Sequence, residues 1–396
     1  MSKTDIFPGQ PIIGQIFILI DVASVNRAAR RTQANRYCKS FMTLDHLYTM
    51  MFTLMSNCMS LREVITGFSG AQSRLGQIGM KGLPSRSNLS DSNARRTSEA
   101  FAQIYHLLVA HYSNTLPDSR ENKELIARAK PIDSSTIQLF SDILETTGRK
   151  PLSGKSKGGI KVHMMLDTAA GIPRCVYFSD AKAHDSKFMG KMSLLPGDIG
   201  VFDKGYVNYR QYQKWNEEGI FFVTREKDNA QYKIVERRKV PKNAEGKVKT
   251  DWIIQVAIPA SDETMLLRRV KYMDPDSGRT FVYWTNLYRV SALNIAAFYK
   301  YRWSIENFFK QIKQNFNLKY FLGESQNAIE IQIWVCLIVN LLYQVLLRQS
   351  KRNWAYSNFC SFVRIHLWTY IFLSDFLNDS VNEMKKKLQL IPQTPD

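Results

Sequence analysis

The stretch "IKVHMMLDTAAGIPRCVYFSD" (residues 160–180) predicts a β-hairpin and decides the fold class of this chain. Two runs rich in apolar and β-branched residues flank a short turn, "AAG". Upstream, "KPIDSSTI" (130–137) is a further β-prone run. Downstream, "DIGVFDKGY" (198–206) predicts an apolar strand, and "YRQYQKWNEEG" (209–219) predicts a helix. We therefore expect an α/β fold that begins with strands in a hairpin and continues through helix–strand alternation.

The charge of the chain indicates the class of its partner. Among 396 residues, 54 Lys+Arg stand against 35 Asp+Glu, a net charge of +19. Such a surplus is typical of proteins that bind nucleic acid or an anionic membrane. The five cysteines are scattered without a CxxC pair, which argues against a disulfide framework or a zinc site and fits a reducing compartment. The longest apolar run (331–347) contains polar residues and is short for a membrane span, so we interpret it as a buried core helix. A cytoplasmic protein that binds nucleic acid is expected.

The regions before, within and after the α/β centre differ in predicted secondary structure and in charge. Apolar residues at three-and-four spacing make residues 1–125 helical, and the chain is helical again beyond 320. Residues from about 219 to 290 are β-rich and strongly basic. We predict a helical N-terminal DNA-binding domain (1–125), a central core (126–320) with a β-rich insertion, and a helical C-terminal region (321–396). The N-terminal helices fit a DNA-reading helix-turn-helix or an ordinary structural pair.

Two acidic residues follow or end apolar strands. Asp133 lies in "PIDSSTI", and Asp203 comes directly after "IGVF". A carboxylate beside a hydrophobic strand costs several kcal/mol unless it is paired or binds a cation. Each is a candidate cation ligand, and for each the ordinary alternative is an aspartate in a turn or a helix cap.

A third acid lies on a helix with an unusual polar stripe. In "FYKYRWSIENFFKQIKQNF" (298–316), Tyr299, Arg302, Glu306 and Lys313 fall within an arc of about 60° at the margin of the apolar face. An Arg302–Glu306 pair on a solvated helix would explain two of these residues and leave the other two unexplained. Three acids from two strands and a distant helix suit two-metal phosphoryl transfer, since Mg²⁺ prefers oxygen ligands.

These residues carry a resemblance to a known family. The spacing Tyr299-x2-Arg302-x3-Glu306-x6-Lys313 resembles the YREK signature of bacterial insertion-sequence DDE transposases, in the group named "IS four". Asp133 and Asp203 look like the first two acids of that family. The resemblance covers about residues 125–320 and implies a ribonuclease-H-like core interrupted by a β-rich insertion.

The resemblance also implies an activity. Members carry out cut-and-paste transposition: DNA cleavage at the element ends, a hairpin intermediate and strand transfer to target DNA. Asp133, Asp203 and Glu306 would hold two Mg²⁺ or Mn²⁺ ions, and Tyr299, Arg302 and Lys313 would grip phosphates. The partners would be double-stranded DNA (terminal inverted repeats and target) and a second copy of the chain, with no membrane.

One aromatic residue is a further candidate for DNA binding. Relatives stack an aromatic of the insertion on a flipped base, and "RTFVYWTNL" (279–287) offers Phe281, Tyr283 and Trp284. Trp284 is preferred because indole has the largest stacking surface, and a core aromatic is the alternative. His163 is interpreted as a strand residue, and the pair His184–Asp185 receives no role.

Three other functions are compatible with parts of these patterns. A structure-specific nuclease would use the same three acids without strand joining. A non-catalytic DNA-binding relative that regulates transposition would keep the acids as remnants. A membrane-surface protein would need basic amphipathic helices with exposed aromatics, whereas the basic residues concentrate in the β-rich block. The polar stripe and the basic insertion favour a transposase.

Overall fold

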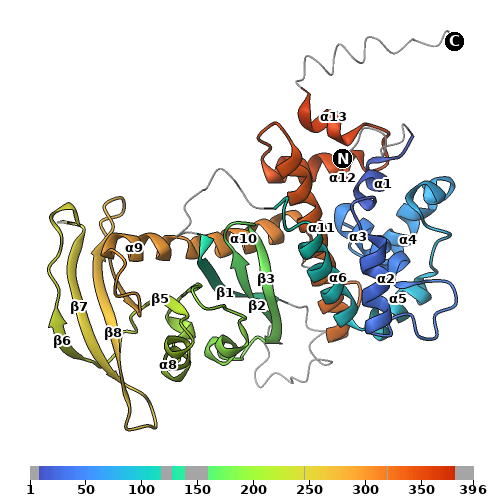
Figure 1. The fold of residues 1–396 in the computed structure, drawn as a ribbon. Helices are drawn as coiled ribbons and strands as arrows, with labels where there is room; N and C mark the ends of the chain where they lie inside the picture. Colours follow the sequence, from blue (N-terminus) through green and yellow to red (C-terminus); the bar gives the residue numbers. More distant parts are fainter. Residues whose placement is uncertain (1–8, 117–126, 139–158, 245, 319, 380–396) are drawn as a thin grey trace, which may run out of the picture. The chain divides into compact units, whose positions relative to one another are not determined.

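The computed structural model describes residues 9–116, 127–138, 159–244, 246–318 and 320–379 (Figure 1). They divide into two compact units. The described residues of the helical unit are 9–116 and 311–379, and those of the α/β unit are 127–138 and 159–310, apart from the two single positions already left out. The domain boundary predicted at residue 125 lies outside the described residues.

The core of the α/β unit is a mixed five-stranded sheet. Its strands are β1 (Ala129–Gln138), β2 (Gly159–Asp167), β3 (Ile172–Asp180), β4 (Ile199–Phe202) and β5 (Phe221–Arg225). They lie in the order β3-β2-β1-β4-β5, with β1–β2–β3 antiparallel and β1–β4–β5 parallel. The predicted hairpin is β2–β3, which turns at Gly171 with a φ of 68°, a left-handed conformation that favours glycine. This order and these directions are those of a ribonuclease-H-like core, so the predicted fold class is confirmed.

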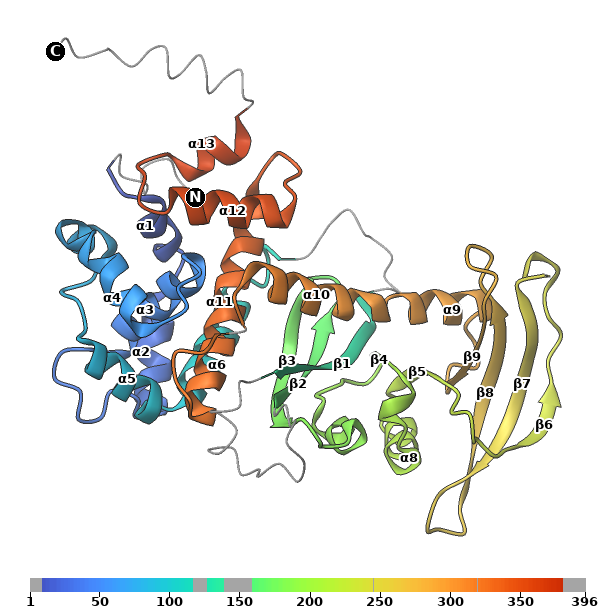
Figure 2. The same ribbon diagram turned by 180° about the vertical axis from the view of Figure 1, so that it is seen from behind.

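Four further strands extend this sheet. They are β6 (Lys233–Arg237), β7 (Val248–Ala257), β8 (Thr264–Met273) and β9 (Thr280–Thr285). β9 pairs antiparallel with β5, and β8, β7 and β6 follow in turn, as Figure 2 shows from behind. The stretch predicted as an insertion, about 219–290, therefore includes one strand of the core. Averaging the basic residues over the whole stretch hides the short apolar run of β5.

Helices cover both faces of the sheet. They are α8 (Tyr209–Glu217) and α9 (Ala292–Lys300). Side chains alternate along a strand, so Phe202 packs with Trp215 of α8, while its neighbour Val201 packs with Ile295 of α9. The chain leaves β4 at the next residue, Asp203, which caps the short 3-10 helix η5 (Lys204–Tyr206). The two packed faces thus fix where Asp203 emerges.

N-terminal and C-terminal helices together form the helical unit. The N-terminal ones are α1 (Ile12–Phe17), α2 (Val22–Arg31), α3 (Thr43–Met55), α4 (Leu61–Ser69), α5 (Arg86–Arg95) and α6 (Ser98–His111). The C-terminal ones are α11 (Gln326–Gln349), α12 (Tyr356–His366) and α13 (Leu373–Asn378). Within the described residues, α11 is the one helix long and apolar enough to span a membrane, and it lies mostly buried against α6, α3 and α5. It is the core helix that the sequence predicts.

Candidate active site

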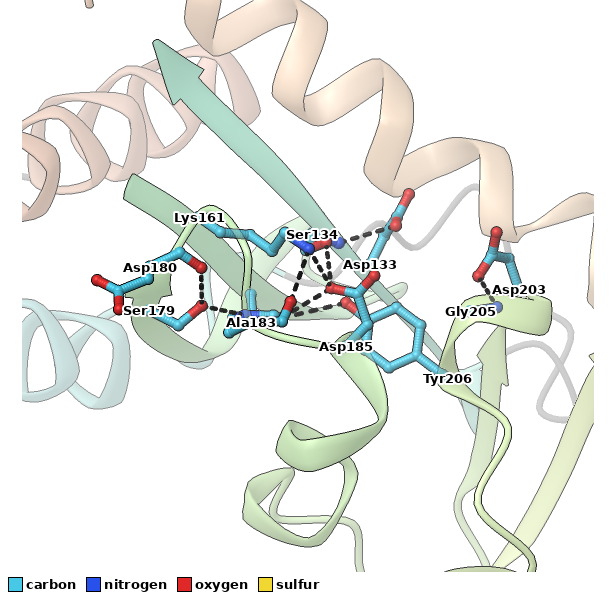
Figure 3. Close-up of polar contacts among 11 residues, drawn as sticks. Asp133, Ser134, Lys161, Ser179, Asp180, Ala183, Asp185, Asp203, Gly205 and Tyr206 are labelled. Carbon is cyan, nitrogen blue, oxygen red and sulfur yellow. Dashed lines mark hydrogen bonds and ion pairs between the residues drawn. The ribbon is translucent and has the colours of Figure 1, made fainter. Parts of the chain in front are cut away.

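The register of two parallel strands brings two of the predicted acids together. Pro131 of β1 is paired with Val201 of β4. Asp133 and Asp203 each lie two residues further along, and side chains two apart project from the same face of a sheet. Figure 3 shows both carboxylates pointing to one side, next to the helix that follows α9.

The pKa of Asp133 depends on the other two acids. Its Oδ1 accepts a hydrogen bond from the Ser134 backbone N–H at 2.8 Å. Burial raises the pKa of Asp133 to about 6, and the negative charges of Asp203 and Glu306 act in the same direction, against the effects of the Ser134 N–H and of Arg302. Asp203 and Glu306 therefore both lie close enough for their charges to act on Asp133.

Arg302 joins two of these carboxylates. It begins α10 (Arg302–Asn315), and its Nη1 lies 2.6 Å from Glu306 Oε1 and 3.4 Å from Asp133 Oδ2. Its Nε is buried and has no hydrogen-bond partner among the described residues. The i,i+4 pair considered from the sequence is thus present, but the same guanidinium also pairs with an acid 169 residues away.

Asp203 makes the local contact expected of a cap as well. Its Oδ1 accepts a hydrogen bond from the Gly205 N–H at 2.7 Å. A Cβ at position 205 would lie 2.9 Å from that oxygen and 3.5 Å from Asp185 Oδ2, and real Cβ atoms essentially never approach another atom within 3.0 Å. A side chain at position 205 would therefore displace the Asp203 carboxylate from its present position.

The remaining residues of the stripe occupy different settings. Tyr299 is only 6% exposed, its ring packs on Tyr283 with centroids 4.9 Å apart, and the Arg302 guanidinium lies 5.5 Å from its ring centre. Burial raises the pKa of Tyr299 to about 12. Tyr299 thus supports Arg302. Lys313, in the last turn of α10, is exposed and belongs to the helical unit.

The structure corrects the choice of stacking aromatic. Trp284 is 2% exposed, lies in the core cluster with Phe202 and Trp215, and donates its indole N–H to Glu226 Oε2 at 2.8 Å. An indole buried in this way offers no face to a base. Trp303, which the sequence pattern does not single out, is 57% exposed and follows Arg302 directly. Its signal was an aromatic residue off the apolar face of α10.

A second polar network, drawn in Figure 3, adjoins Asp133. Asp185 begins the 3-10 helix η4 (Asp185–Lys191). Its Oδ1 accepts hydrogen bonds from Ser134 Oγ at 2.9 Å and Lys161 Nζ at 3.1 Å. The backbone N–H of the same serine binds Asp133. Asp185, which the sequence left without a role, is thus linked to the candidate site through one residue.

His163 lies behind this network and has the strand position that the sequence predicts. It is fully buried in β2, stacks on Phe188 with ring centroids 3.9 Å apart, and its Nδ1 lies 3.6 Å from Asp185 Oδ1. Burial lowers the pKa of His163 to about 4. The ring is therefore neutral at pH 7, and it contributes to packing against Phe188.

The donor atoms of the site fit a hard divalent cation. Carboxylate oxygens are the ligands that Mg²⁺ and Mn²⁺ prefer. As the side chains stand, no three Asp, Glu, His or Cys residues in the described part of the chain are close enough to hold a metal ion. Arg302 instead supplies positive charge between Asp133 and Glu306. The acids fit the cation in chemistry, and their charge is balanced by a guanidinium.

Comparison with known families decides what these acids belong to. A family model described as "Transposase DDE domain" matches residues 128–342, more than half of the chain. This chain belongs to the DDE transposase family. Members are enzymes that cut and join DNA and depend on divalent cations, so the transposase acts on DNA. A second family model, a domain of unknown function (DUF4372), matches residues 8–81.

Individual relatives of the transposase agree with this family. A putative transposase y4zB of Sinorhizobium fredii is 32% identical over 68% of this chain and 73% of its own length. A probable transposase for insertion sequence element IS5377 of Geobacillus stearothermophilus is 27% identical over 62% of this chain and 65% of its own length. Among solved structures, a piggyBac transposase synaptic complex with hairpin DNA matches with a TM-score of 0.46 at 9% identity, covering 98% of this chain and 87% of that one.

Proposed function

We propose that this transposase catalyses cut-and-paste transposition of an insertion sequence of the "IS four" group, with Asp133, Asp203 and Glu306 as its catalytic acids. The observation that carries the proposal is that these three acids come together. The paired strands β1 and β4 place Asp133 and Asp203 at the same edge of the sheet. Arg302 then links Asp133 to Glu306. A solvated Arg302–Glu306 pair would not need a third, half-buried acid.

The three carboxylates would hold two Mg²⁺ or Mn²⁺ ions in each site. When bound, the ions activate the attacking oxygen and stabilise the leaving one. Water hydrolyses one strand at the element end and leaves a 3′-OH. This hydroxyl attacks the phosphodiester of the opposite strand, which forms the hairpin and releases the flanking DNA with its own 3′-OH. A second water opens the hairpin, and the restored 3′-OH attacks a target phosphodiester, whose 3′ oxygen leaves. The residues of the chain would hold the phosphodiester in the orientation that the attacking oxygen needs.

Arg302 changes partners in this scheme. In the protein alone it neutralises Asp133 and Glu306. A cation held by these acids would supply the charge that Arg302 supplies to them, and the guanidinium would then be available for charge-assisted hydrogen bonds to a DNA phosphate. The ring of Tyr299 beneath it keeps its orientation. Lys313 contacts a phosphate further along the DNA.

Trp303 takes the stacking role first considered for Trp284. The Arg302 guanidinium lies 5.6 Å from its ring centre, so an exposed indole stands next to the phosphate-binding group. A flipped base stacked on this indole would lie beside the phosphate held by Arg302. Stacking of a base on an aromatic side chain is worth about 1–3 kcal/mol.

The proposal includes the partners and the division of the chain. The transposase acts in the cytoplasm, at the nucleoid, on double-stranded DNA, and works as a homodimer that bridges two element ends. Residues 1–125 bind DNA, residues 126–320 are catalytic, and residues 321–396 are a helical C-terminal region.

The test begins with the DNA that flanks the gene. That DNA is sequenced, and the purified protein is incubated with it and a target plasmid, with Mg²⁺ or with a chelator. We expect inverted repeats cut at their tips, hairpin ends on denaturing gels, and joined target products, all requiring metal. Cutting without joining would identify a nuclease. Repeats bound but never cut would identify a regulatory relative.

A further inference from the structure

A basic surface covers α2 and the loop that follows it in the helical unit. Between residues 22 and 44 the chain has no Asp or Glu. It has five exposed cations there: Arg27, Arg30, Arg31, Arg36 and Lys39. Among the residues that the structure describes, none of the five forms an ion pair with a carboxylate, whereas Arg95 on the neighbouring α5 pairs with Asp91 at 2.9 Å. Cations that repel one another without local compensation are expected where an anionic partner binds.

The packing of α2 fixes which side faces outward. Arg27, Arg30 and Arg31 are spaced i, i+3 and i+4 and share one face. The opposite face, which includes Val25 and Ala28, is almost completely buried in the core of the unit. A membrane-surface helix inserts its apolar face into lipid. That face is occupied in α2, so only the cationic side is available to a partner.

The loop after α2 continues the surface as a groove. With α5 it borders a hollow of about 540 Å³ to which the loop contributes Arg36, Tyr37 and Lys39, and α5 contributes Asp91 paired with Arg95. Figure 1 shows α2 and α5 as neighbours. Tyr37 is 88% exposed, and the Arg36 guanidinium lies 4.8 Å from its ring centre. The loop side of the groove thus presents the Arg36 guanidinium, the Lys39 ammonium and the Tyr37 hydroxyl. All three kinds of group bind phosphate oxygens in protein–DNA interfaces.

Hydrogen bonds from within the chain hold the loop in this shape. Gln33 and Tyr37 have φ angles of 56° and 61°, and a left-handed conformation costs a residue with a side chain about 1 kcal/mol or more. Buried Arg96 offsets this cost by donating from Nε to the Ala34 carbonyl at 3.1 Å and from Nη2 to the Phe41 carbonyl at 2.7 Å. A preformed loop loses less entropy on binding.

We propose that Arg27, Arg30, Arg31, Arg36 and Lys39, with the Tyr37 hydroxyl, bind the phosphate backbone of duplex DNA. This rests on the proposed function and gives a role to a segment whose family model carries none. The fork of an arginine matches a phosphate bidentately, and four of the five cations are arginines. A flexible acidic protein would be served equally by lysines.

The experiment measures binding of the full-length protein to a fluorescent duplex of the element end, in chelator and over a series of salt concentrations. The variants are Arg27→Gln/Arg30→Gln/Arg31→Gln, the matching triple lysine variant, and Arg62→Gln on α4 as a control. The glutamine triple should bind at least about 10-fold more weakly in low salt and should lose about 2.7 from the slope of log K against log salt, about 0.9 for each phosphate contact. The lysine triple and the control should keep the slope.

Competition and thermal melting complete the test. Equal melting temperatures of the variants show that each is folded. A glutamine triple that binds like the wild type, while the wild type binds in a salt-dependent manner and cuts with metal, would overturn this surface and leave the proposed function standing. A wild type that neither binds nor cuts the duplex would remove the proposed function itself. Displacement by polyglutamate or anionic vesicles in preference to duplex DNA would also overturn the surface.

Discussion

The hydroxyl of Ser134 donates a hydrogen bond to Asp185 at 2.9 Å, while the backbone N–H of the same serine holds Asp133 at 2.8 Å. A single serine therefore links a candidate catalytic acid to a carboxylate 51 residues beyond that serine. Lys161 Nζ donates to the same oxygen of Asp185 at 3.1 Å. Residues that orient a ligand in this way affect metal affinity as well as rate.

Asp185→Asn should slow metal-dependent cleavage by about 10-fold or more and raise the metal concentration needed for half-maximal rate. The amide keeps the size of the side chain and one acceptor oxygen but not the charge that balances Lys161, so the oxygen that Ser134 and Lys161 share becomes a weaker acceptor and holds Ser134 less firmly. Cleavage kinetics over a metal series and calorimetric metal titration measure the two effects. Asp262→Asn, an exposed acid of the same unit, is the control. Unchanged metal affinity in Asp185→Asn would show that Asp185 has no positioning role.

Arg302→Gln should make the protein respond more strongly to metal while it cleaves DNA more slowly. In the wild type, a cation competes with the guanidinium for Glu306 and Asp133, to which Arg302 lies 2.6 and 3.4 Å away. Without that competitor, added Mg²⁺ should raise the melting temperature more than in the wild type. Differential scanning fluorimetry at several Mg²⁺ concentrations measures this shift. A smaller shift than in the wild type would mean that Arg302 helps to form the metal site.

Two tryptophans should separate stability from DNA contact. Trp284→Ala removes a buried indole and should lower the free energy of unfolding by about 3–5 kcal/mol. Trp303→Ala should leave stability within about 0.5 kcal/mol, because the ring is exposed. It should instead reduce hairpin formation and the fluorescence change of a 2-aminopurine placed at the element end. Normal hairpin formation by Trp303→Ala would exclude the base-stacking role.

Asp133 should give the metal-free protein a pH dependence of known sign. Its pKa is about 6 in the folded protein and 3.8 when unperturbed, so between these values the folded state binds more protons than the unfolded state. Stability from this group therefore falls as pH rises from about 4 to 6, by at most about 3 kcal/mol. Metal binding should strengthen over the same range, because it needs the carboxylate.

Chemical denaturation of wild type and Asp133→Asn in chelator isolates this contribution. The difference in unfolding free energy between the two proteins should change between about pH 4 and 6 and stay constant above. A difference that does not vary with pH in that range would contradict the raised pKa.

Local sequence patterns predict the β-hairpin correctly, whereas the average composition of a long stretch conceals the short strand β5. Residues 160–180 alternate and turn in the way that a hairpin requires, and the structure forms that hairpin. β5 has only five residues within a long basic stretch, so its apolar centre did not stand out. Strand order follows from packing on both faces, which no local pattern contains.

The same distinction holds in the candidate site. Spacing on one helix identified Arg302 and Glu306, and the structure joins them to Asp133. Size favours Trp284 for base stacking, but β9 is covered on both faces, so Trp284 and its neighbour Tyr283 are both buried. The β2–β3 hairpin, which lies between Ser134 and Asp185 in the chain, brings these two residues together, and no spacing in the sequence predicts this contact.

The central claim is that Glu306, with Asp133 and Asp203, holds the catalytic metal. Glu306→Gln keeps the size of the side chain and an oxygen for Arg302 but removes the charge that a divalent cation needs. The decisive measurement is strand cleavage of an element-end duplex in Mg²⁺, together with duplex binding in chelator, with Glu263→Gln as the control. We predict a loss of cleavage of at least about 100-fold with binding within about twofold of wild type, since no phosphate contact is removed. Cleavage at the wild-type rate by Glu306→Gln would contradict the assignment of this residue as a metal ligand.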